Sequence, residues 1–255
     1  MLVAFQMGSA PPLCNAQDAD SCIDFNVKRT RLAGTTEASV TDTPEDSKLT
    51  KTKSRWAELG KFLTGLTSRP QDSRLPPGQH LVKNWPVLDL GQTPSIAKEN
   101  WRLDIRGTIE HPTTWTWHDL MSAPQTRKLS DIHCVTSWSR YDNNWDGVTT
   151  HDLMEAVQPK PEATHVLLTS NDGYTTNLTL EDFSSPEAIL AHSWEGQPLP
   201  LDHGGPVRLV VPHLYFWKSA KWIRKIEFAT ADHPGFWEVR GYHNRGDPWR
   251  EERYS

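Results

Sequence analysis

The sequence predicts a mixed α+β fold, in which a β-sheet or sandwich core carries scattered helices. Strand-like segments outnumber helical ones after residue 80, and they do not alternate regularly with helices as they would in βαβ units. Almost all of the 12 Trp also lie in this part of the chain. Since a buried indole needs a partner for its N–H group, these residues predict polar, aromatic-rich internal layers.

Strand signals follow one another along the chain from residue 101. The alternation of WRLDIRGTI (101–109) predicts the first strand. HVLLTSNDGYTTNLTL (165–180) predicts a hairpin, because Asn-Asp-Gly between two β-prone runs is typical of a tight turn. The apolar runs PVRLVVP (206–212) and KWIRKIEFA (221–229) predict two further strands.

Helical signals in the same region are short. We expect WTWHDLMSA (115–123) to begin a short helix and LEDFSSPEAILAHSW (180–194) to form a helix followed by a loop. The polar run after KLSDIH (128–133) is expected to be a loop, in which Asp142 and Asp146 act as caps.

Composition divides the chain into three parts. Residues 1–50 are rich in Thr, Ser, Asp, Ala and Lys with few aromatic residues, which predicts a disordered N-terminal tail. Residues 51–73 are predicted to hold a short helix, from helical spacing of apolar residues in SRWAELGKFLTGL (54–66), and a Pro-rich linker that begins at residue 68. Residues 74–255 are predicted to form the functional domain.

Charge and targeting signals narrow the function classes. The formal net charge is −5, so nothing indicates nucleic acid or an anionic membrane as a partner. No apolar run reaches 18 residues, so no membrane span is expected. The N-terminus has no basic region before its apolar patch and no twin-arginine pair, and the domain has no disulfide framework. Together these features favour a cytoplasmic protein.

Cys134 is the one cysteine of the domain and has four possible roles. It could be a small buried hydrophobic residue, or a nucleophile whose thiolate His133 or Arg140 stabilises. A zinc site is poorly supported, because the chain has no second cysteine or histidine at metal-ligand spacing. The fourth role is a thiolate ligand of a metal that an organic cofactor also holds.

The segment DHGGPVRLVVPHLYFWKSAKWIRK (202–225) could supply the anion site that such a cofactor needs. His203 and Arg208 stand around a Gly-Gly-Pro turn, and Ser219, Ala220 and Lys221 follow eleven to thirteen residues after Arg208. Arg and Lys bind phosphate, and Ser together with backbone N–H groups completes a phosphate cradle. The alternatives are a solvated basic face or contact with nucleic-acid phosphates.

Four separated motifs resemble the sulfite oxidase-type molybdopterin-binding family, in its small single-domain form. They are IHCVTSWS…WDGV, GQPLPLDHGGPVRLVVP, WKSAKWIRKIEF and GYHNRGDPWREERY, and the resemblance runs from about residue 74 to 254. It implies the sulfite oxidase fold and a molybdenum-molybdopterin cofactor. Cys134 would ligate the metal, next to two sulfurs of the pterin dithiolene. The resemblance assigns the cofactor contacts to Lys83, Asn84, Ser170 or Asn171, His203, Arg208, Ser219, Ala220 and Lys221.

Two departures from the family bear on the substrate. His192 stands where sulfite oxidases carry a tyrosine near the metal, and Lys83 stands where they carry an arginine. A Lys is a point charge where an Arg is a bidentate fork, and a His titrates near neutrality. We therefore expect an enzyme that transfers an oxygen atom on a small substrate other than sulfite. His192 would donate a proton or contact substrate, and Trp138 or Trp145 would form a wall.

Three alternatives stay open, and the electron donor or acceptor is not identified. The first is a reductase of the methionine-sulfoxide type, whose known representatives are exported. The second is a binding module that keeps the fold without the cofactor. The third is a Cys-His hydrolase, for which the sequence shows no oriented base.

Overall fold

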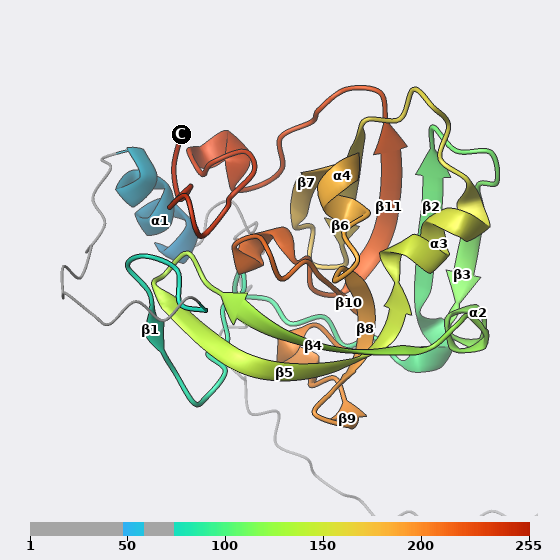
Figure 1. Ribbon diagram of the computed structural model, residues 1–255, viewed down its shortest axis with the longest axis horizontal. Coiled ribbons are helices and arrows are strands. Elements are labelled where there is room, and N and C mark those ends of the chain that lie inside the picture. The colour runs from blue at the N-terminus through green and yellow to red at the C-terminus, as the bar shows by residue number, and fades with distance from the viewer. Residues whose placement is uncertain (1–47, 59–73) are drawn as a thin grey trace, which may run out of the picture. The chain divides into compact units, whose positions relative to one another are not determined.

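The computed structural model describes residues 48–58 and 74–255, and residues 74–255 form a mixed α+β domain built on two sheets (Figure 1). The strands are β1 (His80–Leu81), β2 (Arg102–Gly107), β3 (Thr113–Thr116), β4 (Thr126–His133), β5 (Trp138–Thr149), β6 (His165–Ser170), β7 (Thr175–Thr179), β8 (Ile189–Trp194), β9 (Gln197–Pro198), β10 (Arg208–Val210) and β11 (Ile223–Ala229).

The helices are short, as the sequence predicts. The α-helices are α1 (Lys48–Glu58), α2 (Trp117–Ser122), α3 (Thr150–Val157) and α4 (Leu180–Phe183). The 3₁₀ helices are η2 (Lys98–Asn100), η3 (Leu201–His203), η4 (Phe216–Lys218) and η5 (Glu238–Arg240). The helices α2, α3 and α4 each begin after a Thr whose hydroxyl accepts a backbone N–H bond, which satisfies one of the unpaired donors of the first turn.

One sheet has the order β1-β5-β8-β10, with β4 also paired to β5 and β9 to β8. The other has the order β3-β2-β11-β6-β7, in which β2 and β11 are parallel and the other pairs are antiparallel. One apolar core spans both sheets and includes Leu103, Ile105, Val148, Leu209, Ile226 and Phe228, each at most 1% exposed.

The structure confirms most of the predicted elements. The 165–180 segment is a hairpin, with Thr169 opposite Thr175 across the Asn-Asp-Gly turn. The predicted strands at 101–109, 206–212 and 221–229 are β2, β10 and β11, and the short helix in 115–123 is α2.

Two predictions of local structure are wrong. The helix expected at the start of 180–194 is α4, but residues 189–194 are strand β8 rather than the expected loop. Pro186 prevents α4 from continuing, and the apolar run that follows pairs with β5 and β10. The expected loop after Cys134 is mostly the long strand β5. Asp142 and Asp146 are therefore not loop caps: they lie in β5 and pair with Arg74 and Arg127, each with an N–O distance of 2.7 Å.

The predictions for the N-terminal region are only partly within the described residues. The tail prediction for residues 1–47 lies outside them, and residues 48–50 are the first turn of α1. The helix expected at 54–66 overlaps α1, which begins six residues earlier, and its part from 59 to 66 lies outside the described residues.

Candidate cofactor site

A cavity of about 810 Å³, including its open mouth, contains the chemistry-bearing residues of the two predicted motifs. Its walls come from residues in the ranges 85–90, 134–138, 170–174, 203–222 and 237–242, with one residue from α1. Segments far apart in the sequence therefore meet around one space, and Cys134 and Arg208 both line it.

Arg208 supplies a buried positive charge to this cavity. It is 1% exposed, and its guanidinium donates to the backbone carbonyls of His203 at 2.8 Å and Ser219 at 2.9 Å. Among the described residues no carboxylate forms an ion pair with it, and burial lowers its pKa to about 9. A buried cation without an acidic partner is costly, so this position favours an anionic ligand.

Lys221 is the second cation of this part of the cavity. Its Nζ donates to the carbonyl of Asp202 at 2.7 Å. Burial and the nearby Arg208 lower the pKa of Lys221 to about 8, against the attraction of nearby carboxylates. A phosphate between Lys221 and Arg208 would offset both effects.

The Gly-Gly turn explains how these two cations come together. Gly204 has φ +108°, in the left-handed region, and a Cβ there would stand 3.0 Å from Lys221 Cβ and 3.1 Å from Arg208 Cβ. Glycine is thus needed at position 204 both for the turn and for its close approach to Lys221 and Arg208.

Two further groups make this part of the cavity suitable for a polar ring system. The hydroxyl of Ser170 is buried and has no hydrogen-bond partner among the described residues. The ring of His203 stacks on Trp85, with centroids 3.7 Å apart and an interplanar angle of 8°. Burial lowers the pKa of His203 to about 4, so its neutral ring can donate or accept a hydrogen bond.

Cys134 lies in the turn between β4 and β5, as the sequence predicts. Its thiol is 3.1 Å from Thr136 Oγ1, and burial raises its pKa. The cationic groups whose charges act most strongly on this thiol are Lys53 and Arg253. We call the part of the cavity around Cys134 its thiol end, and the part around Arg208 and Lys221 its basic end.

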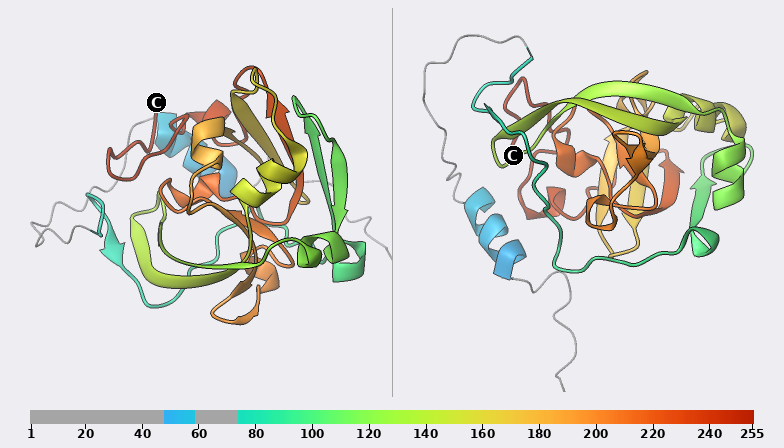
Figure 2. Two further views of the ribbon diagram at one scale, coloured as in Figure 1. Left: turned by 45° about the vertical axis from the view of Figure 1, so that its right-hand side comes forward. Right: turned by 90° about the horizontal axis from the view of Figure 1, so that it is seen from below.

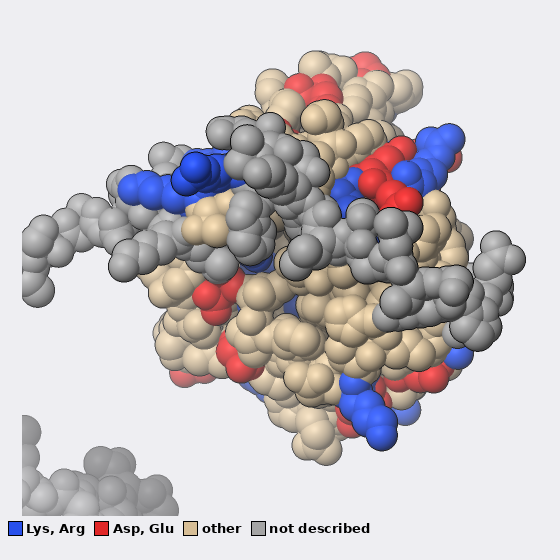
Figure 3. All heavy atoms as spheres, turned by 90° about the vertical axis from the view of Figure 1, so that its left-hand side faces the viewer, with Lys and Arg blue, Asp and Glu red and all other residues tan. Residues whose placement is uncertain are grey.

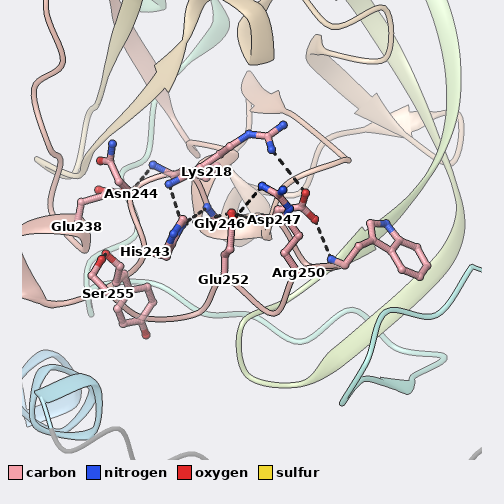
Figure 4. A network of polar contacts seen from close by, with 12 residues as sticks. Lys218, Glu238, His243, Asn244, Gly246, Asp247, Arg250, Glu252 and Ser255 are labelled. Atoms are coloured by element: carbon pink, nitrogen blue, oxygen red, sulfur yellow. Dashed lines mark hydrogen bonds and ion pairs between the residues drawn. The ribbon is translucent and has the colours of Figure 1, made fainter.

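The C-terminal segment holds the Cys134 turn in place. Arg253 is buried and donates to the carbonyls of Val135 and Pro77, while Gln79 donates to the carbonyl of Cys134 at 3.1 Å. Figure 4 shows a polar network in the same C-terminal segment, in which His243 accepts a hydrogen bond from the Gly246 amide and lies 3.3 Å from Glu252.

The structure brings most of the predicted site residues together. Cys134, Ser170, His203, Arg208, Ser219 and Lys221 line the cavity. Lys83 and Asn84 are exposed, and Ala220 is buried with its carbonyl bound to the amide of Leu209; none of these three is among the described lining residues. Trp138 lines the cavity, whereas Trp145 is fully buried in the core.

His192 also lies outside the described lining of the cavity. Its ring nitrogens are 2.9 Å from Ser193 Oγ and 2.9 Å from Gln125 Oε1, and the ring packs edge-on against Trp117. It occupies strand β8, where its partners come from the region of α2 rather than from the Cys134 turn. The structure therefore gives His192 no contact with the thiol end.

Trp85 and Lys53 are among the cavity residues that sequence reasoning missed. Trp85 directly follows Lys83 and Asn84, and it lines the cavity where those two residues were predicted to do so. The sequence could have indicated Trp85, because it is an aromatic residue next to two proposed cofactor contacts. Lys53 lies in the part predicted to be a helix and linker, and nothing in its local sequence indicates a functional site.

A comparison with family models assigns the domain. The model described as oxidoreductase molybdopterin binding domain matches residues 90–237, more than half of the 255 residues. The chain belongs to this family. It is a molybdopterin-binding oxidoreductase, and its cofactor is molybdenum-molybdopterin.

Known proteins are similar to the chain over different lengths. The "Uncharacterized oxidoreductase YuiH" of Bacillus subtilis is 46% identical over 186 residues, which cover 72% of this chain and 94% of that protein. The protein-methionine-sulfoxide reductase catalytic subunit MsrP of Campylobacter jejuni is 31% identical over 157 residues, or 55% of this chain. The match covers 52% of MsrP, so the chain spans only about half of that relative.

A solved structure supports the fold. The sulfane dehydrogenase SoxCD from Paracoccus pantotrophus matches with a TM-score of 0.53 at 21% identity, over 62% of this chain and 46% of that chain. This likeness confirms the predicted sulfite oxidase-type fold, with its mixed sheets and few helices.

The residues present fit the family's cofactor. Arg208 and Lys221 offer two cations without ion-pair partners within the described part of the chain, and the orphaned Ser170 hydroxyl faces the same cavity. Thiolate is a ligand that soft metals prefer, and Cys134 supplies one at the other end. The donor set thus matches an anionic pterin phosphate at one end and a metal at the other.

Two features bear on the predicted absence of membrane and nucleic-acid partners: the length of the described helices and the mixture of charges on one face. No helix within the described residues is long and apolar enough to cross a bilayer. On the face in Figure 3, Lys and Arg occur in small separate groups, with Asp and Glu among and between them. Arg208 and Lys218 are at most 1% exposed, so these two cations do not belong to a solvated face, whereas Arg224 of the same segment is exposed.

Proposed function

We propose that this oxidoreductase transfers an oxygen atom to or from a small organic substrate, with reduction of an S-oxide or N-oxide as the leading reaction. The observation that carries the proposal is the single cavity that joins Cys134 to Arg208 and Lys221. The bound molybdenum would supply the two-electron redox chemistry and the oxygen-atom exchange.

The chain's own residues would bind and orient this group. Cys134, as a thiolate, would ligate the metal, and the surrounding burial would limit the access of water to it. Arg208, Lys221 and the Ser219 region would hold the pterin phosphate through charge-assisted hydrogen bonds. Ser170 and His203 would contact the pterin with neutral donors or acceptors.

The two arginines nearest the candidate cofactor support a substrate other than sulfite. Arg208 is the one arginine among the described lining residues, and its donors point to backbone carbonyls. Arg253 acts on Cys134 but donates to the carbonyls of Val135 and Pro77. A bidentate arginine fork, the group best suited to a sulfite oxyanion, is thus not offered by these two residues.

Methionine-sulfoxide reduction is a narrower alternative, in which this one S-oxide is the dedicated substrate. The similarity to MsrP supports it, although the match covers about half of that protein. The cofactor-free binding module gains no support, because the cations, the orphaned hydroxyl and the thiol are all retained around the cavity.

Steady-state kinetics with an artificial electron donor test the proposal. We expect turnover of S-oxides or N-oxides by the molybdenum-loaded enzyme and little oxidation of sulfite with an artificial acceptor. Efficient sulfite oxidation without reduction of any S-oxide or N-oxide would contradict it. A panel that includes free and peptide-bound methionine sulfoxide separates the alternative from the leading reaction.

A further inference from the structure

Lys53 is a cation at the thiol end of the cavity, and it comes from outside the matched family domain. It lies on α1, which contacts η5 near the C-terminus (Figure 1, Figure 2), whereas the family match begins at residue 90. Its side chain lines the cavity together with Cys134, and the negative charge of a Cys134 thiolate would raise the pKa of Lys53.

The ammonium of Lys53 differs from the other cations of the site. Arg208, Lys221 and Arg253 all donate to backbone carbonyls. Within residues 48–58 and 74–255, Lys53 forms no hydrogen bond or ion pair. Its Nζ lies 5.8 Å from the centroid of the Trp237 ring, and the carboxylate of Asp89 attracts it from beyond ion-pair distance.

The surroundings of Lys53 make this charge costly without a partner. Leu88, Leu90 and Val135 line the same cavity, and burial lowers the pKa of Lys53. A partly buried ammonium in apolar surroundings is stabilised by a negative charge brought to it. The Trp237 ring contributes a weak cation–π attraction but no countercharge.

We propose that Lys53 is a specificity-determining residue, whose ammonium pairs with an anionic group of the substrate at the thiol end of the cavity. The class of substrate is an S-oxide or N-oxide that carries a carboxylate or a similar acid. The reaction type rests on the proposed function, but the binding of the anion does not.

Equilibrium binding to the oxidised holoenzyme tests the pairing without turnover. Isothermal titration calorimetry is run with 4-(methylsulfonyl)benzoate and with neutral methyl phenyl sulfone, two unreactive analogues that differ by one charge. The variants are Lys53→Gln and Lys53→Arg. Lys51→Gln is the matched control, because it removes the same charge from an exposed position on α1.

We expect the wild type to bind the carboxylated sulfone about tenfold more tightly than the neutral one. Lys53→Gln should abolish this preference, whereas Lys53→Arg and Lys51→Gln should retain it. With the corresponding sulfoxides, Lys53→Gln should raise KM about tenfold for the charged substrate with kcat unchanged. An equal affinity of wild type and Lys53→Gln for the charged sulfone would overturn the inference.

The two proposals fail separately. A charge preference that depends on Lys53, in an enzyme that reduces no sulfoxide, would leave the inference intact and reject the proposed reaction. Sulfoxide turnover with no effect of Lys53→Gln on the binding of either sulfone would reject the inference alone. Unchanged metal content and melting temperature in Lys53→Gln would exclude a merely structural effect.

Discussion

Lys221 shows how a single buried charge links cofactor binding to pH. Its pKa is about 8 in the folded chain, below its ordinary value of 10.5. Between these two values the unfolded chain binds more protons, so the free energy of unfolding of the cofactor-free protein should rise with pH. The rise should be smaller in Lys221→Gln, and a bound phosphate should remove it by raising the pKa of Lys221.

Chemical denaturation between about pH 8 and 10.5 measures this contribution. The quantity to compare is the difference between wild type and Lys221→Gln at each pH, because tyrosines also titrate in this range. A difference that does not vary with pH would contradict the assignment. Lys221→Gln should also lower the pterin content of protein isolated with its cofactor.

His192 is the residue for which sequence and structure point in different directions. Its alignment with a metal-proximal tyrosine predicts a proton role with a rate that changes near pH 6 to 7. In the structure its ring bonds to Ser193 and Gln125, outside the described lining of the cavity. We therefore expect His192→Gln to leave kcat and its pH profile unchanged. A pH profile that shifts in the variant would restore the role that the sequence predicts.

At the scale of elements, the turn that joins η3 to β10 positions the basic end of the cavity. Gly204→Ala places a Cβ in the left-handed region, which costs about 1 to 2 kcal/mol, and crowds both Lys221 and Arg208. We expect loss of thermal stability and of bound cofactor. Gly173→Ala is the matched control, because Gly173 also has positive φ but has no heavy atom within 4 Å of the added Cβ.

Melting temperature and pterin content of the two variants separate strain from crowding. Both variants should lose stability, whereas only Gly204→Ala should lose most of its cofactor. Equal cofactor content in the two variants would show that the close approach of Lys221 and Arg208 does not matter for binding.

The elements differ in how far the sequence predicts them, for physical reasons. The 165–180 hairpin was predictable because its turn chemistry and its strand alternation are both local. Strand β5 was not predictable from its local sequence, because its acidic side chains form ion pairs with residues on other segments. Asp142 pairs with Arg74, and Asp146 pairs with Arg127. Strand β8 depends in the same way on pairing with β5 and β10.

The site residues likewise divide into those that local sequence predicts and those that only the tertiary fold brings to the cavity. Cys134, Arg208 and Lys221 stand in motifs whose residue types already indicate metal and phosphate chemistry, and the structure brings them to one cavity. Trp85 and Lys53 join them only through the tertiary fold, because their local sequences carry no matching pattern. The substrate end of the cavity is accordingly the part that the sequence predicts least well.

For the whole molecule, the central claim is that Cys134 ligates molybdenum in a cofactor whose phosphate lies at Arg208 and Lys221. Resemblance to the family motifs, membership of the family and the shared cavity all support it. The cytoplasmic location stays a prediction, since the structure adds only that no described helix could span a membrane.

X-ray absorption at the molybdenum K edge tests this claim most directly, on protein isolated from a host that makes the pterin cofactor. We predict that the wild type shows three sulfur ligands, two from the dithiolene and one from Cys134, and that Cys134→Ser shows two with its pterin retained. The same number of sulfur ligands in both proteins, or stoichiometric zinc without pterin in the wild type, would contradict the account.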